Sequence, residues 1–253
     1  MKKALIVVGG ASNIAGFFLD RLRKKKKRYE EIHLCDVKDI NRKIELNTYH
    51  YNNCTEEKIY QDILKKLSQN FKLDVIVFAA MDFPVEKNKK FESGFSPSSD
   101  ELRKVLEVNT ILPYTLAKTM IELKTEKTRL ILIGSIYGKV TPNPYLYDTT
   151  EKTHRIKPAP YSITKTTLKT ISMYAGMELG RRGGDSFVIS FGAIENKNMS
   201  RQFKTKYRQL SGGCKVIKIK RIAKTIDKML ELPKGVLNGG EVVFDGGYTS
   251  VCL

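Results

Sequence analysis

An alternation of short apolar runs with longer amphipathic stretches limits the folds open to this chain more than any other feature. The apolar runs span residues 5–8, 32–35, 75–79, 130–133, 187–190 and 241–244, and helix-like periodicity covers residues 14–28, 55–69, 99–127, 161–180 and 219–231. Several runs lack the alternation of a half-exposed strand, as is typical of parallel strands covered on both faces. The pattern predicts an α/β fold with one doubly wound parallel sheet, in a single domain over residues 1–253.

The chain is strongly basic, with a formal charge of +18 and its densest block of cations at residues 21–28. Such a block can bind nucleic acid or an anionic membrane, or it can be the solvated end of a helix, where cations complement the helix dipole. We expect the helix end, because no aromatic interleaving or nucleic-acid motif accompanies the block. Neither a nucleic-acid nor a membrane partner is expected.

Cysteine usage and the absence of long apolar stretches bear on metal binding and on the cellular compartment. The four cysteines and three histidines show no metal-ligand spacing, so no metal site is predicted and a reducing compartment fits best. The first apolar run stops at Gly9, which is too early for a signal peptide, and no run approaches the roughly 20 residues of a membrane span. We therefore expect a cytoplasmic protein.

The first predicted strand runs into a glycine-rich turn at residues 9–16 and then into a helix. Glycine lets the backbone approach a pyrophosphate closely, and the amino end of a helix favours its negative charge. Asp36 closes the second predicted strand, twenty residues after Gly16. A carboxylate there can accept hydrogen bonds from a ribose and repel a 2′-phosphate. These features predict a Rossmann-type dinucleotide site that prefers NAD over NADP.

Two tyrosine–lysine pairs have the spacing required for proton transfer on one helix face. Residues four apart leave the same face, and an ammonium beside a phenol lowers the tyrosine pKa from about 10 toward neutral pH. Tyr161 and Lys165 form one pair, and Tyr114 and Lys118 form the other. The spacing alone does not choose between the two pairs.

The order of motifs along nearly the whole chain resembles the short-chain dehydrogenase/reductase family. Gly10, Ile14 and Gly16 match its glycine-rich turn, with isoleucine in place of the middle glycine. Further matching segments are residues 53–55, 73–81, 107–110, 130–138, 188–196 and 237–248. In this order the catalytic tyrosine follows the strand that ends at Ser135, which selects Tyr161 over Tyr114.

The resemblance implies hydride transfer between a nicotinamide and a hydroxyl or carbonyl group. It assigns proton transfer to Tyr161, support of the phenolate and the nicotinamide ribose to Lys165, a hydrogen bond to the reacting oxygen to Ser135, and a water of the proton relay to Asn109. The implied cofactor contacts are Gly10, Asn13, Ile14, Gly16, Asp36, Asn53, Ala79, Ala80, Tyr161, Lys165, Gly192, Ile194 and Asn196. Because family members usually form homodimers or homotetramers, a homo-oligomer is expected.

The substrate class is predicted from a long insert and a basic loop. Ser135 lies 26 residues before Tyr161, a longer spacing than in most classical members of the family. The insert and the Ser-Ile-Tyr-Gly run are similar to a bacterial subgroup of flagellin-modification and nonulosonic-acid sugar pathways. With the basic loop at residues 195–213, this likeness predicts an anionic substrate, a phosphorylated or nucleotide-linked sugar, although the loop also fits a solvated surface. The expected substrate contacts are Ser135, Tyr137, Arg201 and Arg208.

Two other functions remain open at the level of sequence. A sugar epimerase or dehydratase that retains its NAD between turnovers would use the same fold without net production of NADH. A non-catalytic protein that senses NAD(H) would need the dinucleotide site alone. The set of Asn109, Ser135, Tyr161 and Lys165 argues against the sensor, because a sensor needs no proton relay.

Overall fold

The fold is built on one seven-stranded parallel sheet. The computed structural model describes residues 2–24, 28–38, 40, 47–51, 56–78, 93–147, 157–197 and 199–251. The strands are β1 (Lys2–Val8), β2 (Glu31–Cys35), β3 (Asn47–Tyr51), β4 (Phe71–Val77), β5 (Arg129–Ser135), β6 (Asp185–Phe191) and β7 (Glu241–Phe244). They pair in the order β3-β2-β1-β4-β5-β6-β7. The predicted doubly wound parallel sheet is confirmed.

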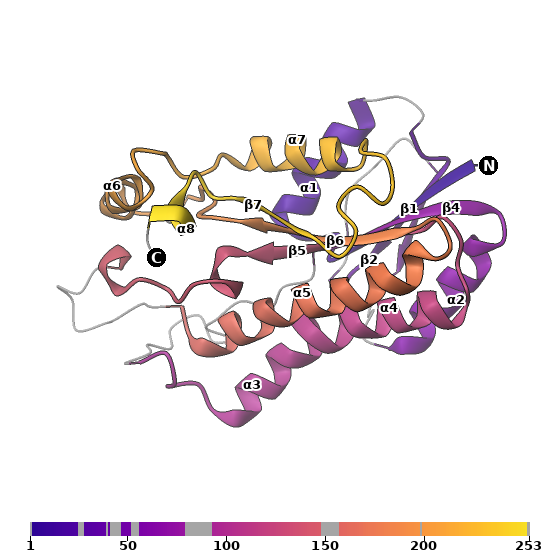
Figure 1. Ribbon diagram of the computed structural model, residues 1–253, viewed down its shortest axis with the longest axis horizontal. Helices are drawn as coiled ribbons and strands as arrows, with labels where there is room; N and C mark the ends of the chain where they lie inside the picture. Colours follow the sequence, from indigo (N-terminus) through magenta and orange to yellow (C-terminus); the bar gives the residue numbers. More distant parts are fainter. Residues whose placement is uncertain are drawn as a thin grey trace.

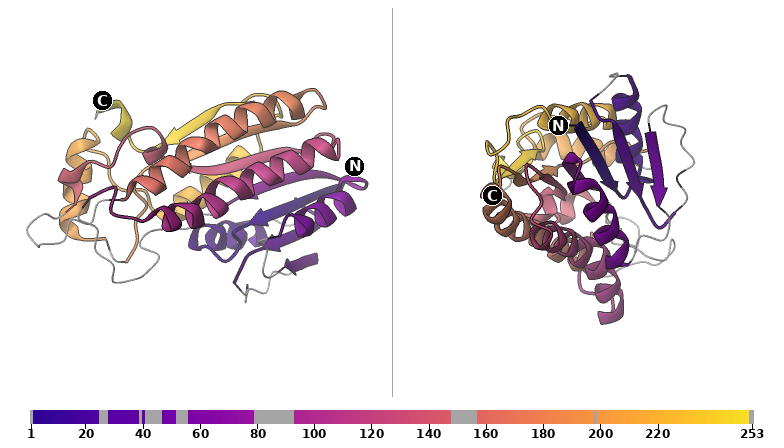
Figure 2. Two further views of the ribbon diagram at one scale, coloured as in Figure 1. Left: turned by 90° about the horizontal axis from the view of Figure 1, so that it is seen from below. Right: turned by 90° about the vertical axis from the view of Figure 1, so that its right-hand side faces the viewer.

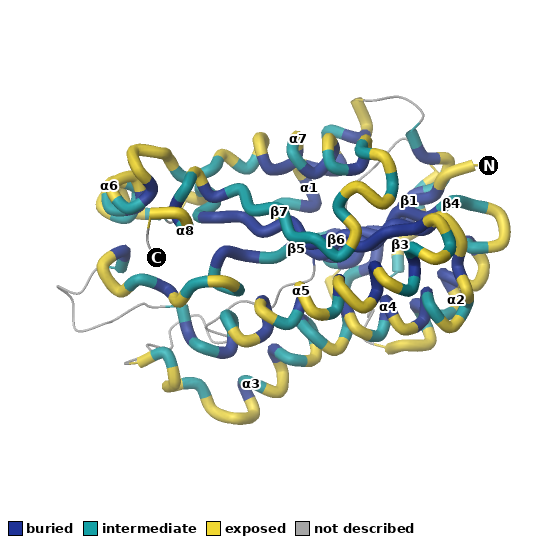
Figure 3. Tube along the Cα trace, in the orientation of Figure 1, coloured by how far each residue is buried: buried dark blue, intermediate teal, exposed yellow. Residues whose placement is uncertain are grey.

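Helices cover both faces of the sheet (Figures 1 and 2). The helices are α1 (Asn13–Lys24), α2 (Glu57–Ser68), α3 (Ser99–Leu106), α4 (Leu112–Glu122), α5 (Ala159–Gly180), α6 (Arg201–Leu210), α7 (Ile219–Met229) and α8 (Tyr248–Val251). One core lies under α1 and α7, and the other lies under α2, α4 and α5. Successive β1 residues enter opposite cores, Val7 beneath α1 and α7 and Val8 beneath α4 and α5. The central strands are therefore buried on both sides, which explains their continuous apolar sequence (Figure 3).

The predicted helix at residues 99–127 is interrupted. Its middle is a π-helical segment, η1 (Glu107–Ile111), between α3 and α4, and the helix ends at Glu122. Pro113 has no amide hydrogen, so it cannot donate the α-helical bond to the carbonyl of Asn109. The amide of Leu112 donates to Glu107 instead, which closes a π-helical turn. Such π-bulges are frequent at functional sites, and this one contains the predicted site residue Asn109.

Strand β3 is not among the apolar runs found in the sequence, although the resemblance implies a third strand before Asn53, and helix α6 was not predicted. Strand β3 lies at the edge of the sheet and is largely exposed, so it carries tyrosine and histidine instead of an apolar run. Helix α6 lies in the segment that was predicted to be a basic loop. Ser200 caps it by accepting a hydrogen bond from the amide of Phe203 at 3.0 Å. Phe203, Tyr207 and Leu210 share one face of α6 and pack together in a small apolar cluster. Helix α6 itself lies beyond the end of the sheet opposite the N-terminus (Figure 1).

Part of the basic block at the end of α1 is structural. Arg21 and Arg28 each contact the carboxylate of Asp227 on α7 at 2.7 Å, and the Asp227 side chain is fully buried. Arg21 therefore ties α1 to α7, and Arg28 ties the segment before β2 to α7, so neither side chain is simply solvated. No helix in the part of the chain that the structure describes has the length and apolar character needed to cross a bilayer.

Candidate active site

The predicted site residues that the structure describes gather at the carboxyl ends of the strands. The glycine turn connects β1 to α1, Ser135 ends β5, and Gly192 follows β6. The strand order reverses between β1 and β4, and open α/β sheets bind ligands at such a reversal. Asn53, Ala79 and Ala80 lie outside the described residues, so their predicted cofactor contacts remain predictions.

The glycine turn bends sharply beside the end of β2. Gly9 has a φ of 81°, which an L side chain rarely adopts. The amides of Gly9 and Gly10 both donate to the carbonyl of Cys35, at 2.8 and 3.3 Å. A Cβ on Gly10 would lie 3.0 Å from the side chain of Ile40, so the turn is packed on its inner side. The turn leads directly into Asn13 at the start of α1, which places the amino end of that helix above the turn.

Ile14, in place of a glycine, occupies the first turn of α1. It is partly buried and packs against the core beneath α1 and α7. The amide of Gly16 donates to the carbonyl of Ser12 at 2.9 Å, so the helix forms normally through this position. The bend at Gly9 and the start of α1 are therefore both preserved with isoleucine at position 14.

Asp36 joins the end of β2 to the glycine turn. Its carboxylate accepts the amide of Ala11 at 2.9 Å and the amide of Lys38 at 3.0 Å. An ionised carboxylate can accept about four hydrogen bonds. Asp36 can therefore hold the turn and still accept bonds from ribose hydroxyls. The fixed negative charge also opposes a phosphate at this position.

Helix α5 carries the tyrosine and the lysine of the predicted proton-transfer pair. Lys165 is 5% exposed, and its Nζ donates to the carbonyl of Ile133 on β5 at 3.0 Å. The same Nζ lies 5.9 Å from the centre of the Tyr161 ring. The other pair differs, because Tyr114 is exposed and Lys118 forms ion pairs at the surface with Glu57 and Glu122. The pair on α5 is therefore anchored to the sheet and the other pair lies on the surface, while the catalytic role of Tyr161 remains a prediction.

The turn after Ser135 packs directly against α5. A Cβ on Gly138 would lie 2.8 Å from the carbonyl oxygen of Lys165, so only glycine permits this approach. The hydroxyl of Thr166 donates to the carbonyl of Gly138 at 3.1 Å. Ser135 Oγ accepts the amide of Tyr137 at 3.2 Å, which orients the serine side chain. The serine turn and the tyrosine helix are thus held in contact.

Asn109 connects to α5 through Thr164, a residue that was not predicted. Asn109 is fully buried, and its Nδ2 donates to Thr164 Oγ1 at 3.2 Å. The Thr164 hydroxyl donates in turn to the carbonyl of Tyr161 at 2.9 Å. A threonine next to Lys165 was the only signal for this role in the sequence. The contact orients the asparagine against the first turn of α5.

The segment after β6 forms the fourth side of the site. Gly192 is buried, and a Cβ there would lie 2.9 Å from the backbone of Asp245 and would collide with the hydroxyl of Tyr207. Ile194 forms a parallel bridge with Ile217. Both bonds of this bridge use the amide and carbonyl of Ile217, so the amide and carbonyl of Ile194 face the other way. Asn196 follows on the exposed surface.

Aromatic side chains cover the site beyond the sheet. The hydroxyl of Tyr137 lies 2.9 Å from that of Tyr147, and the Tyr147 ring meets Phe203 of α6 edge-on at 5.8 Å. Tyr207 stacks on Tyr248 at 5.0 Å. Burial, reinforced by Tyr147, raises the pKa of Tyr137 well above its ordinary value, so its hydroxyl stays neutral. Helix α6 is therefore attached to the serine turn through Tyr137 and Tyr147.

Arg201 and Arg208 lie on the exposed side of α6. Arg208 Nε donates to the carbonyl of Gly213 at 3.1 Å, which closes the end of the helix. The opposite side of α6 carries the aromatic contacts. The structure gives no contact between either arginine and the predicted catalytic residues that it describes, so their substrate contacts remain predictions.

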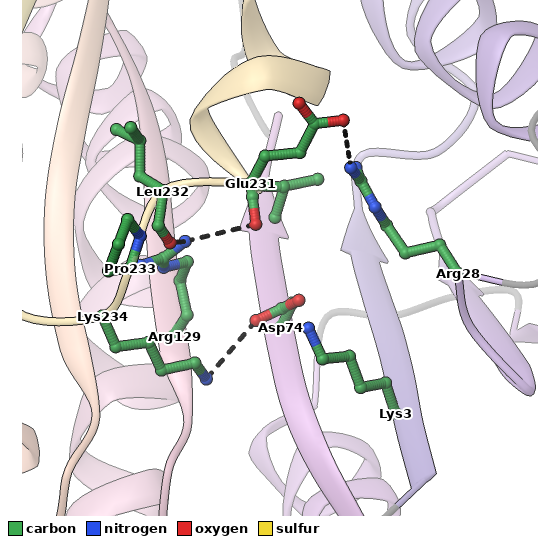
Figure 4. A pocket seen from close by; sticks show the side chains of 9 residues that line it. Lys3, Arg28, Asp74, Arg129, Glu231, Leu232, Pro233 and Lys234 are labelled. Carbon is green, nitrogen blue, oxygen red and sulfur yellow. Dashed lines mark hydrogen bonds and ion pairs between the residues drawn. The ribbon is translucent and has the colours of Figure 1, made fainter.

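A concavity lies at the end of the strands opposite the candidate site, near the amino ends of β1, β4 and β5 (Figure 4). Its volume is about 390 Å³, and charged side chains line it. Arg129 is bound by both oxygens of Asp185, at 2.7 and 2.8 Å, and by backbone carbonyls that follow α7. Lys234 lies 3.5 Å from Asp74, and burial lowers the pKa of its ammonium. Arg129 and Lys234 are thus paired with carboxylates, and Arg28 pairs with Glu231 at 2.7 Å, so these contacts support the fold.

Comparisons with known proteins identify the fold. No family model and no curated protein sequence matches the chain. A short-chain dehydrogenase from Leptospira borgpetersenii with bound NAD+ has a TM-score of 0.77 at 18% identity, over 98% of this chain and 93% of that chain. A 3-oxoacyl-[acyl-carrier protein] reductase from Brucella melitensis has a TM-score of 0.74 at 16% identity, over 97% and 91%. ElxO with bound NADP has a TM-score of 0.73 at 17% identity, over 99% and 100%. The chain has the fold of the short-chain dehydrogenases/reductases.

Proposed function

We propose that this protein is an NAD(P)-dependent oxidoreductase of the short-chain dehydrogenase/reductase family, and that it interconverts a hydroxyl and a carbonyl group of a small substrate. One observation carries the proposal: the turn after Ser135 is packed against the backbone of Lys165, on the helix that also carries Tyr161. In the proposed site, the phenol and the amine of α5 and the alcohol at the end of β5 act together at the carboxyl edge of the sheet. This is the edge at which open α/β sheets bind ligands.

The residues of the site fit a bound dinucleotide. The glycine turn and the amino end of α1 suit a pyrophosphate, Asp36 suits a ribose, and the outward-facing amide and carbonyl of Ile194 suit a carboxamide. A bound nicotinamide supplies or accepts the hydride. The protein binds and orients the reactants and moves the proton.

Proton transfer falls to the side chains around α5. Tyr161 gives its phenolic proton to the substrate oxygen in reduction and takes it back in oxidation. Lys165, whose Nζ donates to the carbonyl of Ile133, would support the phenolate and hold a ribose hydroxyl of the bound cofactor. Ser135 donates a hydrogen bond to the oxygen on which negative charge develops. Asn109, oriented by Thr164, holds the outer end of the proton relay.

The catalytic assignment is tested by replacement of Tyr161. We expect purified Tyr161→Phe to bind NADH with the wild-type affinity and to reduce carbonyl substrates at least about 10²-fold more slowly. Tyr114→Phe removes a hydroxyl from the other pair, on the exposed surface, and should keep the wild-type rate. A Tyr161→Phe variant with wild-type turnover would reject the assignment.

For the cofactor, we propose a preference for NAD over NADP. Its support is the carboxylate of Asp36, which is fixed at the glycine turn by two backbone amides. Asp36→Ala should weaken NADH binding by about 10- to 100-fold, the range expected for loss of hydrogen bonds to a charged group, and should improve binding of NADPH. Asp20→Ala, on the exposed face of α1, is the matched control. Equal affinities of the wild type for the two cofactors would contradict the preference.

For the substrate, we propose an anionic sugar derivative, phosphorylated or nucleotide-linked. Its support is the basic composition of α6 and its neighbours, together with the resemblance of the insert before Tyr161. Arg201 and Arg208 would contact the anionic group if α6 moves toward the substrate. Removal of both arginines should raise the KM for the true substrate, and an unchanged KM would exclude them as contacts.

We also propose that the protein forms a homo-oligomer through α4 and α5. These helices lie side by side on one face of the sheet (Figure 2). Helix α5 exposes Ile163, Met173, Tyr174 and Met177. Ile163, Tyr174 and Met177 are spaced to share one face of the helix. A second copy of the chain would remove this apolar strip from water.

A further inference from the structure

One side-chain hydroxyl connects the segment after β6 to the segment after β7. Tyr207 lies on the inner side of α6 and is fully buried. Its hydroxyl donates to the carbonyl of Asp245 at 2.7 Å and accepts the amide of Ala193 at 3.3 Å. Asp245 directly follows β7, and Ala193 follows β6, so this single group joins α6 to the ends of both strands. Helices α6 and α8 lie side by side at this end of the sheet (Figures 1 and 2).

Stacked aromatic rings fix the position of this hydroxyl. The Tyr207 ring stacks on Tyr248 of α8 at 5.0 Å, with 8° between the ring planes, and on Phe203 of α6 at 6.3 Å and 15°. Burial raises the pKa of Tyr207 well above its ordinary value, so the hydroxyl keeps its proton and can donate to Asp245. Asp245 is itself held, because its carboxylate accepts the amide of Thr249 at 2.8 Å. The hydroxyl therefore has a fixed place at the strand ends.

The backbone on either side of Ile194 is held by four hydrogen bonds. Three of these are between backbone groups, at 2.9, 2.8 and 2.9 Å: Gly192 N to Phe244 O, Ile217 N to Ala193 O, and Glu195 N to Ile217 O. The fourth joins the amide of Ala193 to the hydroxyl of Tyr207. A side-chain substitution can therefore remove this one bond and leave the other three in place.

The hydroxyl also lies directly against Gly192. A Cβ at position 192 would collide with it and would lie 2.9 Å from the backbone of Asp245. Glycine at this position thus allows the hydroxyl to lie between the two strand ends. Tyr207 is in this way a direct neighbour of the segment in which the amide and carbonyl of Ile194 face away from Ile217.

We propose that Tyr207 is a positioning residue for the nicotinamide ring of the cofactor. This inference rests on the proposed oxidoreductase function and deepens it. The outward amide and carbonyl of Ile194 match the oxygen and the NH2 group of a carboxamide. The hydroxyl of Tyr207 fixes the residue before Ile194, and so it determines where those two groups lie. It acts through the backbone, and the adenosine end of the cofactor, at the glycine turn and Asp36, does not depend on it.

A purely structural role for the hydroxyl would have different consequences. Tyr207 also joins α6 to the turn before α8, and a hydroxyl that served only this purpose would affect the stability of the fold. Its loss would then change the binding of both halves of the cofactor alike, or of neither. ADP-ribose contains the adenosine, the pyrophosphate and the second ribose but no nicotinamide. A comparison of NADH with ADP-ribose therefore isolates the part of the affinity that depends on the ring.

The experiment measures the affinities of NADH and ADP-ribose for the wild type and two variants by calorimetry. Tyr207→Phe removes the hydroxyl and keeps the stacked ring. Tyr29→Phe is the matched control, because it removes another buried tyrosine hydroxyl, which donates to Asp74 at 2.8 Å near the amino ends of the strands. Thermal midpoints of both variants record the stability that each deletion removes.

We expect Tyr207→Phe to weaken NADH by about 3- to 10-fold relative to ADP-ribose, the range for loss of one hydrogen bond, and to leave the affinity for ADP-ribose unchanged. Tyr29→Phe should keep the wild-type ratio of the two affinities, whatever the change in its thermal midpoint. Hydrogen exchange gives a second reading. In the wild type NADH should slow exchange over residues 192–196 more than ADP-ribose does, and Tyr207→Phe should reduce this difference.

Two results would overturn the inference: an unchanged ratio of affinities in Tyr207→Phe, and an equal loss of affinity for both ligands. If Tyr207→Phe does not fold, Phe203→Leu replaces it in the test, because this variant keeps the hydroxyl but removes one ring of the stack. A smaller loss of NADH affinity relative to ADP-ribose is expected there, and an unchanged ratio would again overturn the inference.

Each of these contrary results leaves the oxidoreductase function standing, provided that NADH binds and Tyr161→Phe is inactive. A protein that binds neither NADH nor ADP-ribose refutes the proposed function itself.

Discussion

Gly138 fixes the distance between the serine turn and the tyrosine helix. Any Cβ at this position would lie 2.8 Å from the Lys165 carbonyl oxygen and 3.2 Å from the amide of Thr166. Both obstacles are backbone, so they cannot rotate away as a side chain could. Because Gly138 has no side chain, the turn that follows Ser135 can pack closely against the helix that carries Tyr161.

Gly138→Ala should lower kcat by about 10²-fold, because a displacement of about 1 Å at a reacting centre has an effect of this size. NADH affinity should change little, since the glycine turn and Asp36 lie elsewhere. Gly94→Ala is the matched control, because its Cβ would lie at an ordinary contact distance of 3.8 Å from the amide of Ala159. Steady-state kinetics of both variants test the point. An active Gly138→Ala variant would show that the contact does not position the site.

At the scale of elements, the buried ion pair of Arg129 and Asp185 joins β5 to β6 at the end of the sheet away from the site. Both side chains are almost fully buried, and Arg129 also binds the carbonyls of Met229, Leu230 and Leu232. One guanidinium thus links two strands to the segment after α7. The ion pairs at the amino ends of the strands therefore support the fold, while the candidate site lies at the carboxyl ends.

Arg129→Met should lower the free energy of unfolding by about 3–5 kcal/mol, because Asp185 would keep a buried charge without its partner. The exposed pair of Arg103 and Asp100 provides the control, and Arg103→Met should cost less than about 1 kcal/mol. Urea unfolding followed by circular dichroism measures both. Equal stability of the two variants would show that the buried pair does not hold the strands together.

The central elements could be predicted because their sequence determines them locally. A strand buried on both faces must be continuously apolar, as β1 and β5 are, so pattern alone locates it. Strand β3 at the edge is exempt from that requirement, so the apolar pattern did not locate it. Helix α6 was missed because its polar, basic composition is typical of a loop. Its apolar residues Phe203, Tyr207 and Leu210 nevertheless repeat at helical spacing.

The candidate site was predicted through the order of its motifs rather than through its contacts. Ser135 lies 26 residues before Tyr161, and the contact between its turn and the helix of Tyr161 and Lys165 arises only in the fold. Thr164 contacts a tertiary neighbour, Asn109, so no local pattern marked it. The break at Asn109 was also missed, even though Pro113 four residues later forbids a regular helix there.

At the scale of the whole molecule, helix α5 has a buried side and an exposed apolar side. Its inner side packs on the sheet and carries Lys165, while its outer side exposes Tyr174, which is 68% accessible to solvent. Large exposed apolar side chains grouped on one helix face mark protein–protein contacts. An interface on α5 would therefore also brace the helix that holds the proton-transfer pair.

Tyr174→Glu should convert the proposed oligomer to a monomer and reduce activity, because the charge would be buried between copies. Light scattering after size exclusion measures the mass, and Val236→Glu, at another exposed apolar position, should leave it unchanged. A wild-type protein that is already monomeric would contradict the proposed interface.

The central claim is that a nicotinamide ring binds beside Tyr161 with Ser135 and Lys165 around it. The most direct measurement is a crystal structure of the protein with NAD+. We predict that C4 of the nicotinamide faces the side of the site that holds Tyr161 and Ser135, with Lys165 bound to the adjoining ribose and Asp36 to the adenosine ribose. A dinucleotide bound at another place, or one whose nicotinamide points away from Tyr161, would contradict the claim.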